Sequence, residues 1–165
     1  MSDALCFDTC AVYGSGGTAT LLRKLRDLFP ERALLIPSFV IAERARQLRV
    51  SKGPDYDASV PARFVEQLEQ LGVAFPPFDT GTALVAWPET AGRFPDDRWR
   101  WEDAPTGSKR PCGQKCRTGD HIVYAIARAH SAVLVTDDRD LLLQVSADGY
   151  QPGAVKLSEV RSWVS

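Results

Sequence analysis

The feature that most constrains this chain is the stretch at residues 118–142, which reads TGDHIVYAIARAHSAVLVTDDRDLL. Apolar side chains recur at helical spacing over residues 120–130, and this pattern predicts an amphipathic helix. Residues 132–135 (AVLV) form a short apolar, β-branched run that is typical of a strand buried in a parallel sheet. The stretch therefore predicts a helix, a turn and a buried strand, in that order.

Acidic and polar side chains follow that predicted strand directly. Thr136, Asp137, Asp138 and Asp140 come immediately after it, and Asp120 lies in the first turn of the preceding helix. In open α/β sheets, ligands and chemistry gather outside the carboxyl ends of the strands, because loops converge there on one crevice. We therefore expect these residues to face a common site.

Two further acids occupy equivalent places near the start of the chain. Residues 4–7 are predicted to form a short strand, and Asp8 stands at its carboxyl end with Thr9 after it. Residues 33–36 are predicted to form a second strand, and Glu43 falls in the helix that follows. Because its helical neighbours are apolar, this glutamate must be paired or bound to a cation.

The pairing of Glu43 stays open on sequence alone. A nearby arginine, Arg44 or Arg46, accounts for the carboxylate as well as a bound cation does. Ser38 is placed to cap the helix that carries it.

The remaining segments alternate between helical and strand patterns. We expect helices over residues 18–29, 59–71 and 80–87, a strand or connector at 73–75, an edge strand at 154–157 and a terminal helix capped by Ser158. Such alternation predicts a single α/β domain over residues 1–165, with three α/β/α layers and a short, mainly parallel central sheet.

Taken together, the acids favour a metal site. Oxygen ligands suit a hard cation, Mg²⁺ or Mn²⁺, and gathered carboxylates repel one another unless a cation neutralises them. Singly, each acid has a plainer explanation, since Asp8 is a good turn residue and Asp138 and Asp140 are good helix caps. Their coincidence at one sheet edge is what favours the site.

At these residues the chain resembles the PIN-domain family of metal-dependent ribonucleases. The resembling segments are LCFDTC around Asp8, IPSFVIAE ending at Glu43, TGDHIVYAIARAH around Asp120 and AVLVTDDRDL around Asp138. The resemblance implies a PIN-like fold and metal ligands at those four acids, which would be the catalytic residues. It adds Asp140 as a further ligand.

The resemblance also implies that Thr136 supports the site, and we expect the same of Thr9 beside Asp8. Many small bacterial PIN proteins are toxins held by an antitoxin, which implies an antitoxin as a possible partner. Two features depart from the pattern. Asp137 stands beside Asp138, so the identity of the fourth ligand stays open, and the chain carries a long inserted loop.

That insert, at about residues 88–117, interleaves cations with aromatic rings. Cations neutralise phosphates and rings stack on unpaired bases, so an RNA-binding segment is expected. Its candidate residues are Arg98, Trp99, Arg100, Trp101, Lys109, Arg110 and Arg117. A surface for a partner protein or a homodimer fits the same residues equally well.

Two cysteines of the insert, Cys112 and Cys116, have a spacing that occurs in zinc sites, and His121 could supply a third ligand. Free thiols in a loop are the simpler interpretation, because a closed zinc site needs four ligands.

Composition narrows the class of protein. The hydrophobic share of 44% and charged share of 25% are those of an ordinary globular protein. Apolar runs are too short to cross a bilayer and the N-terminus lacks a secretion signal, so no membrane association and a cytoplasmic location are expected. The net charge of −1 does not decide for or against nucleic acid.

The sequence thus favours a Mg²⁺- or Mn²⁺-dependent endoribonuclease acting on RNA. Two alternatives stay open. One is a nucleic-acid or protein-binding module that keeps the fold but does not cut. The other is a small phosphohydrolase with Asp8 as nucleophile, although Cys10 stands where such enzymes need a second aspartate.

Overall fold

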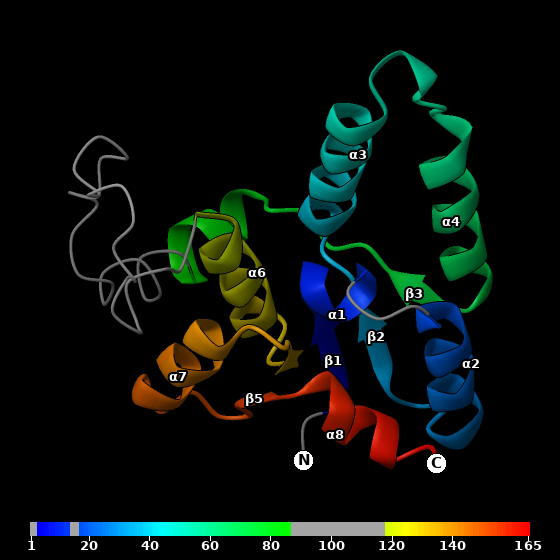
Figure 1. Ribbon diagram of the computed structural model, residues 1–165. Coiled ribbons are helices and arrows are strands. Elements are labelled where there is room, and N and C mark those ends of the chain that lie inside the picture. Colours follow the sequence, from blue (N-terminus) through cyan, green and yellow to red (C-terminus); the bar gives the residue numbers. More distant parts are fainter. Residues whose placement is uncertain (1–2, 14–16, 87–117) are drawn as a thin grey trace.

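The protein forms an α/β fold around a five-stranded, all-parallel sheet, as seen in a computed structural model that describes residues 3–13, 17–86 and 118–165 (Figure 1). The strands lie in the order β3-β2-β1-β4-β5. Their bounds are Ala4–Phe7 for β1, Ala33–Leu35 for β2, Val73–Ala74 for β3, Val133–Val135 for β4 and Ala154–Val155 for β5. The predicted α/β class and parallel sheet are confirmed.

Helices connect these strands. They are α1 (Thr9–Tyr13), α2 (Thr18–Leu28), α3 (Ser38–Lys52), α4 (Ser59–Gln70), α6 (Thr118–Ala129), α7 (Arg139–Ala147) and α8 (Leu157–Ser162), with a short 3₁₀ turn η1 (Gly53–Asp55) and a π-helix η2 (Thr82–Ala86). No helix in the described ranges is long and apolar enough to cross a membrane.

The strand order creates a switch point between β1 and β4. From β1 the chain moves outward through β2 to β3, and it then returns to the other side of β1 for β4 and β5. Because crossovers between parallel strands are right-handed, reversing direction changes the face on which the helices pack. Figure 1 shows α6 and α7 on one side of the sheet and α2 and α4 on the other. The loops that leave the carboxyl ends of β1 and β4 therefore run in opposite directions, and open α/β sheets form crevices at such a point.

The central strand is buried on both faces. Leu5, Cys6 and Phe7 of β1 are fully buried, as expected of a strand with helices on both sides. Tyr124 and Ile126 of α6 are buried against it from one layer, and Leu22 of α2 is buried in the other. This core fixes the ends of β1 and β4 and hence the loops that leave them.

Most predicted elements are present, but two predicted caps are wrong. Ser38 is the first residue of α3, and the N-cap position is occupied by Pro37, which makes no side-chain capping hydrogen bond. The terminal helix α8 begins at Leu157, one residue before the predicted cap Ser158. Instead the Leu157 N–H donates to Asp137 Oδ1 at 3.1 Å, so a residue distant in sequence caps this helix.

A half-buried arginine of α2 links two turns of the chain through hydrogen bonds. Arg26 of α2 donates from its guanidinium to four backbone carbonyls, those of Pro30, Arg32, Leu71 and Gly72, at 2.9–3.2 Å. These carbonyls belong to the turn before β2 and to the end of α4, where the last carbonyls of a helix need a donor from outside the helix.

We expect Arg26→Ala to lower the free energy of unfolding by about 1–3 kcal/mol, because hydrogen bonds from a charged donor are lost at several carbonyls. Arg23→Ala on the same helix is the matched control, since Arg23 is exposed, and its effect should stay within about 0.5 kcal/mol. Urea denaturation measures both. Equal stability of the two variants would contradict the role assigned to Arg26.

Candidate functional site

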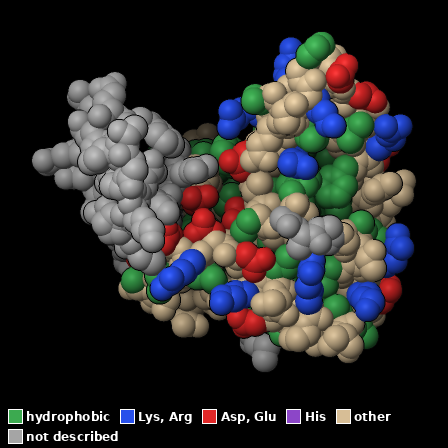
Figure 2. Space-filling model, viewed as in Figure 1, with side chains coloured by type: hydrophobic (Ala, Val, Ile, Leu, Met, Phe, Trp, Pro, Cys, Tyr) green, Lys and Arg blue, Asp and Glu red, His purple; other side chains and the backbone are tan. Residues whose placement is uncertain are grey.

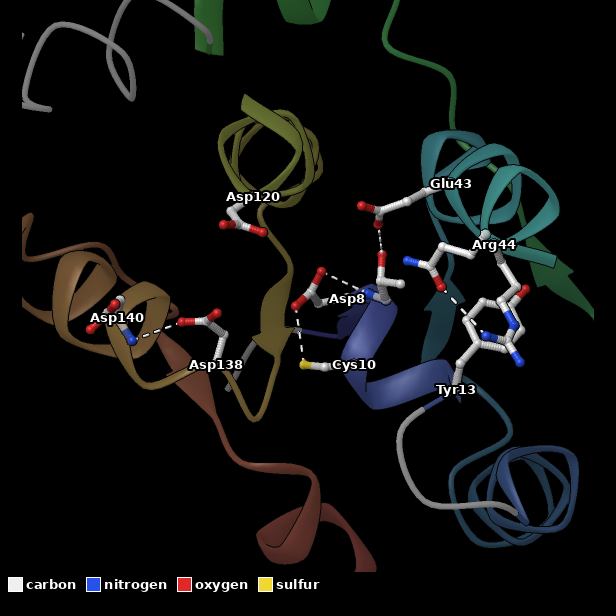
Figure 3. Close-up of a pocket in the computed structure, with 10 residues that line it drawn as sticks. Asp8, Cys10, Tyr13, Glu43, Arg44, Asp120, Asp138 and Asp140 are labelled. Carbon is white, nitrogen blue, oxygen red and sulfur yellow. Dashed lines mark hydrogen bonds between the residues drawn. The ribbon is translucent and has the colours of Figure 1, made fainter. Parts of the chain in front are cut away.

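A pocket of about 440 Å³ lies at the switch point, outside the carboxyl ends of β1 and β4. It is lined by residues from four separate parts of the chain (Figure 3): Asp8, Thr9, Cys10, Tyr13, Glu43, Arg44, Gln47, Asp120, Asp138 and Asp140. All five predicted acids and Thr9 are therefore brought to one pocket, as the sheet-edge argument predicts.

Asp8 is the most deeply placed of these acids. It is only 4% exposed, and its Oδ1 accepts the Thr9 N–H at 2.7 Å. Its Oδ2 accepts the Thr136 hydroxyl at 2.9 Å and the Cys10 thiol at 3.2 Å. Burial raises the pKa of the Asp8 carboxyl, and the charge of Asp138 raises it further, whereas these hydrogen bonds act to lower it.

Thr136 joins the ends of the two central strands. The residue is fully buried, and its hydroxyl donates to Asp8 while accepting the Asp138 N–H at 3.0 Å. A single side chain thereby sets the position of one acid after β1 and of another after β4. These two hydrogen bonds are compatible with the supporting role that the PIN resemblance implies for Thr136.

Asp138 is the N-cap of α7. Its Oδ1 accepts the N–H groups of Asp140 and Leu141 at 2.8 and 3.0 Å, so the capping explanation considered from sequence is correct for this oxygen. Capping also fixes the orientation of the carboxylate, and Asp138 still lines the pocket. The neighbouring Asp137 is not among the lining residues, because its carboxylate caps α8. Of the two adjacent aspartates, Asp138 is the one at the site.

Glu43 reaches the pocket from α3 and is held by Thr9. Its Oε2 accepts the Thr9 hydroxyl at 2.6 Å, and in the described ranges no arginine forms an ion pair with it. The helix α6 passes close by, since a Cβ built at Gly119 would lie 2.9 Å from Cε1 of Phe39 and 3.9 Å from Oε1 of Glu43. Glycine at this position therefore lets α3 and α6 approach, which sets Glu43 beside Asp120.

The remaining acids stand on helices at opposite edges of the pocket. Figure 3 shows Asp120 on α6 turned toward the space around Asp8, with Glu43 across from it. Asp140 on α7 lies on the far side of Asp138 and is the most peripheral acid. The acidic end of the pocket is thus centred on the space between four residues: Asp8, Glu43, Asp120 and Asp138.

The Cys10 thiol completes the network beneath this space. It donates to Asp8 and lies 3.3 Å from the Thr136 hydroxyl, and it accepts the Asp137 N–H at 3.1 Å. Burial raises the pKa of this thiol to about 11, and the charge of Asp8 adds to the effect. The thiol therefore stays protonated at neutral pH and serves as a hydrogen-bond donor to the carboxylate.

The donor set fits a hard cation in its chemistry. Carboxylate and hydroxyl oxygens are the ligands of Mg²⁺ and Mn²⁺, and both ions keep several waters, so few protein ligands suffice. Within the described ranges, however, no three His, Cys, Asp or Glu side chains are grouped closely enough to hold a metal ion together. The acids surround the space without closing on it, so binding would require side-chain rotation.

Four lining residues were not predicted as site residues: Cys10, Tyr13, Arg44 and Gln47. Tyr13 and Arg44 lie at the end of the pocket opposite Asp140, and Gln47 accepts a hydrogen bond from Arg44. Helical spacing carried a signal for two of them, since Tyr13 is four residues after Thr9 and Gln47 is four after Glu43. Figure 2 shows acidic side chains gathered beside the hollow, with Lys and Arg spread over the rest of this face, including the α3–α4 side.

The predicted RNA-binding residues of the insert lie outside the described residues: Arg98, Trp99, Arg100, Trp101, Lys109, Arg110 and Arg117. The same holds for Cys112 and Cys116, and hence for a zinc site that would include them.

No known family matches this chain in a family comparison, and no curated protein matches it either.

We expect Asp8→Asn, in the absence of metal, to be more stable than the wild type near neutral pH. A carboxyl whose pKa is raised by folding binds its proton more tightly in the folded state, so its contribution to stability falls as pH rises. Asparagine has no such titration. The advantage of the variant should therefore be smallest at acid pH and widen toward neutral pH.

Urea denaturation in EDTA across a pH series measures this difference. Asp27→Asn, at an exposed position of α2, is the control and should show no comparable trend. A gap between Asp8→Asn and the wild type that narrows toward neutral pH would contradict the burial argument.

Proposed function

We propose that the protein is a Mg²⁺- or Mn²⁺-dependent endoribonuclease with a PIN-like fold. The observation that carries the proposal is the pocket at the switch point, where acids from four separate segments meet. Those segments are the ones whose sequences resemble the PIN family. A parallel α/β sheet with this strand order is compatible with that family, and the resemblance supplies the ribonuclease activity.

The chemistry of the acids supports phosphodiester hydrolysis. A divalent cation held there would polarise a phosphoryl oxygen and lower the pKa of a coordinated water. The ligands would come from Asp8, Glu43, Asp120 and Asp138, with Asp140 at the periphery. An acid cluster without such an ion would repel the phosphates of a substrate.

The protein's own contribution is to hold these oxygens in place. Thr136 orients Asp8 and the backbone of Asp138, and Thr9 orients Glu43. Holding these side chains in place limits the rotation that is needed to bring the acids together on an ion. We assign Thr9 and Thr136 to positioning and the carboxylates to binding.

The phosphohydrolase alternative is disfavoured by the surroundings of Asp8. A nucleophilic carboxylate needs an exposed oxygen that can approach phosphorus in line. Asp8 is 4% exposed, and both of its oxygens already accept hydrogen bonds. These contacts suit a fixed ligand better than a nucleophile.

The proposal extends to the location of the protein, its partner and the role of the insert. RNA as substrate implies a cytoplasmic location, and the PIN resemblance suggests a toxin with an antitoxin partner. The basic and aromatic residues of the insert would contribute to RNA binding or, equally, to a partner-protein or dimer surface.

We expect Asp120→Asn and Asp8→Asn each to abolish cleavage of single-stranded RNA while leaving the fold intact. Both substitutions keep the shape of the side chain and remove the charge that would hold the metal. Asp27→Asn is the matched control and should cut at the wild-type rate. Gel-based cleavage assays with Mg²⁺ or Mn²⁺ and circular dichroism give the two readouts. Absence of cleavage by the wild type would favour the non-cleaving binding module.

We expect Mg²⁺ or Mn²⁺ to raise the melting temperature of the wild type, because a ligand that binds only the folded state stabilises it. The rise should disappear in the Glu43→Gln, Asp138→Asn double variant. Asparagine is itself a good N-cap, so α7 should keep its cap in this variant.

Asp137→Asn separates the two adjacent aspartates in the same thermal assay. It should retain the metal effect, because Asp137 is turned toward α8. An equal metal-induced shift in the wild type and the double variant would remove Glu43 and Asp138 from the proposed ligands.

A further inference from the structure

We propose that Arg44, supported by Tyr13 and Gln47, binds a backbone phosphate of the RNA strand next to the bond that is cut. This inference rests on the proposed nuclease function and adds to it a subsite for the flanking strand. The three residues line the same pocket as the acids, and Figure 3 shows Arg44 and Tyr13 at the end opposite Asp140.

The charge of Arg44 is not neutralised by the acids around it. Five carboxylates line the same pocket, and one of them, Glu43, is its neighbour in the chain. Among the described residues, nevertheless, none forms an ion pair with Arg44. Glu43 is instead directed to Thr9 at 2.6 Å. A half-buried guanidinium without a carboxylate partner is available to an anion from outside.

The contacts of Arg44 leave the edge of its guanidinium for such an anion. The guanidinium carbon lies over the Tyr13 ring, 5.0 Å from its centre, so the cation occupies one face of the ring. Tyr13 is itself backed by Phe64 of α4, with ring centres 5.4 Å apart. A hydrogen bond to Gln47 Oε1, at 3.4 Å, steadies the group from the side.

This arrangement favours phosphate over a nucleobase as the ligand. A base would stack on an open ring face, but Arg44 occupies one face of the Tyr13 ring and Phe64 packs against the same ring. The N–H groups at the guanidinium edge match the oxygens of phosphate in pairs. The ligand class is therefore a polynucleotide with a second phosphate beyond the one at the acids, and not a free mononucleotide.

A positive charge at Arg44 would reduce the repulsion between the acids of the pocket and the RNA phosphates. Even with a bound divalent cation, the acidic end of the pocket attracts only the phosphate that contacts the ion, and the acids repel those on either side. A cation at the opposite end offsets this repulsion for one flanking phosphate and sets the direction in which the strand leaves the pocket.

The test measures binding of a labelled oligouridylate by fluorescence anisotropy across a salt series, with Mg²⁺ present. Every variant is made in the Asp120→Asn background, in which cleavage is expected to be absent. Adding Arg44→Ala should weaken binding at least about tenfold at low salt. It should also reduce the slope of log K against log salt by about 0.7, the value for one phosphate of a single strand.

Arg49→Ala is the matched control. Arg49 lies on the same helix and also sits over a ring, 5.8 Å from the centre of Tyr56, but it does not line the pocket. Its loss should leave the affinity within about twofold and the salt slope unchanged. Equal losses in Arg44→Ala and Arg49→Ala would overturn the subsite in favour of a diffuse basic surface. Arg44→Lys keeps the charge but not the paired donors, so we expect an intermediate affinity.

A double-mutant cycle separates binding from packing. If Tyr13 acts by holding Arg44, Tyr13→Leu should weaken RNA binding, and the loss should not add to that of Arg44→Ala. Tyr13→Phe keeps the ring and should bind RNA as the background protein does. Melting temperatures of all variants show whether any loss reflects unfolding.

The two proposals fail separately. Unchanged affinity and salt slope in Arg44→Ala would overturn the subsite, whatever the wild type cuts. A wild type that binds the strand through Arg44 but never cuts it would overturn the nuclease function and leave the subsite standing.

Discussion

The hydroxyl of Thr136 is the contact on which the site depends. A carboxylate as buried as that of Asp8 is unfavourable unless hydrogen bonds replace the lost water. Thr136 supplies one of them and accepts the backbone N–H of Asp138 with the same oxygen. The two strands that flank the switch point are therefore joined at their ends by a polar contact as well as by their sheet hydrogen bonds. Removing the hydroxyl would leave Asp8 short of a donor in a position that water hardly reaches.

The acidic residues around the pocket have the same carboxylate group but different hydrogen-bond partners. Asp138 uses one oxygen to cap α7, Asp137 uses one to cap α8, and Glu43 accepts the Thr9 hydroxyl. Caps of this kind orient a carboxylate at little cost, because the helix N–H groups need acceptors in any case. The fold thus obtains oriented carboxylates from interactions that helix ends require.

The parts of the site that follow from sheet geometry were predictable from the sequence. Asp8 and Asp138 end neighbouring parallel strands, so their proximity required only that both strands be identified correctly. The pairing of Arg44 with Tyr13 was not predictable, because it joins α1 to α3 across 31 positions of the chain and depends on how those helices pack. The role of Asp137 was missed for the same reason, since its partner Leu157 lies 20 residues further on. Local patterns indicate what a residue can do, whereas tertiary contacts select which of its options is used.

The glycine at position 119 has a consequence for how the pocket comes into being. Glu43 lies on α3, which, with α4, connects β2 to β3 in one half of the sheet. Asp120 lies on α6, which precedes β4 in the other half. Only the missing side chain between them allows Phe39 and the start of α6 to touch. Neither half of the sheet therefore contains the acidic centre by itself. It exists only where the two halves of the sheet pack against each other, so an intact acidic centre requires that packing.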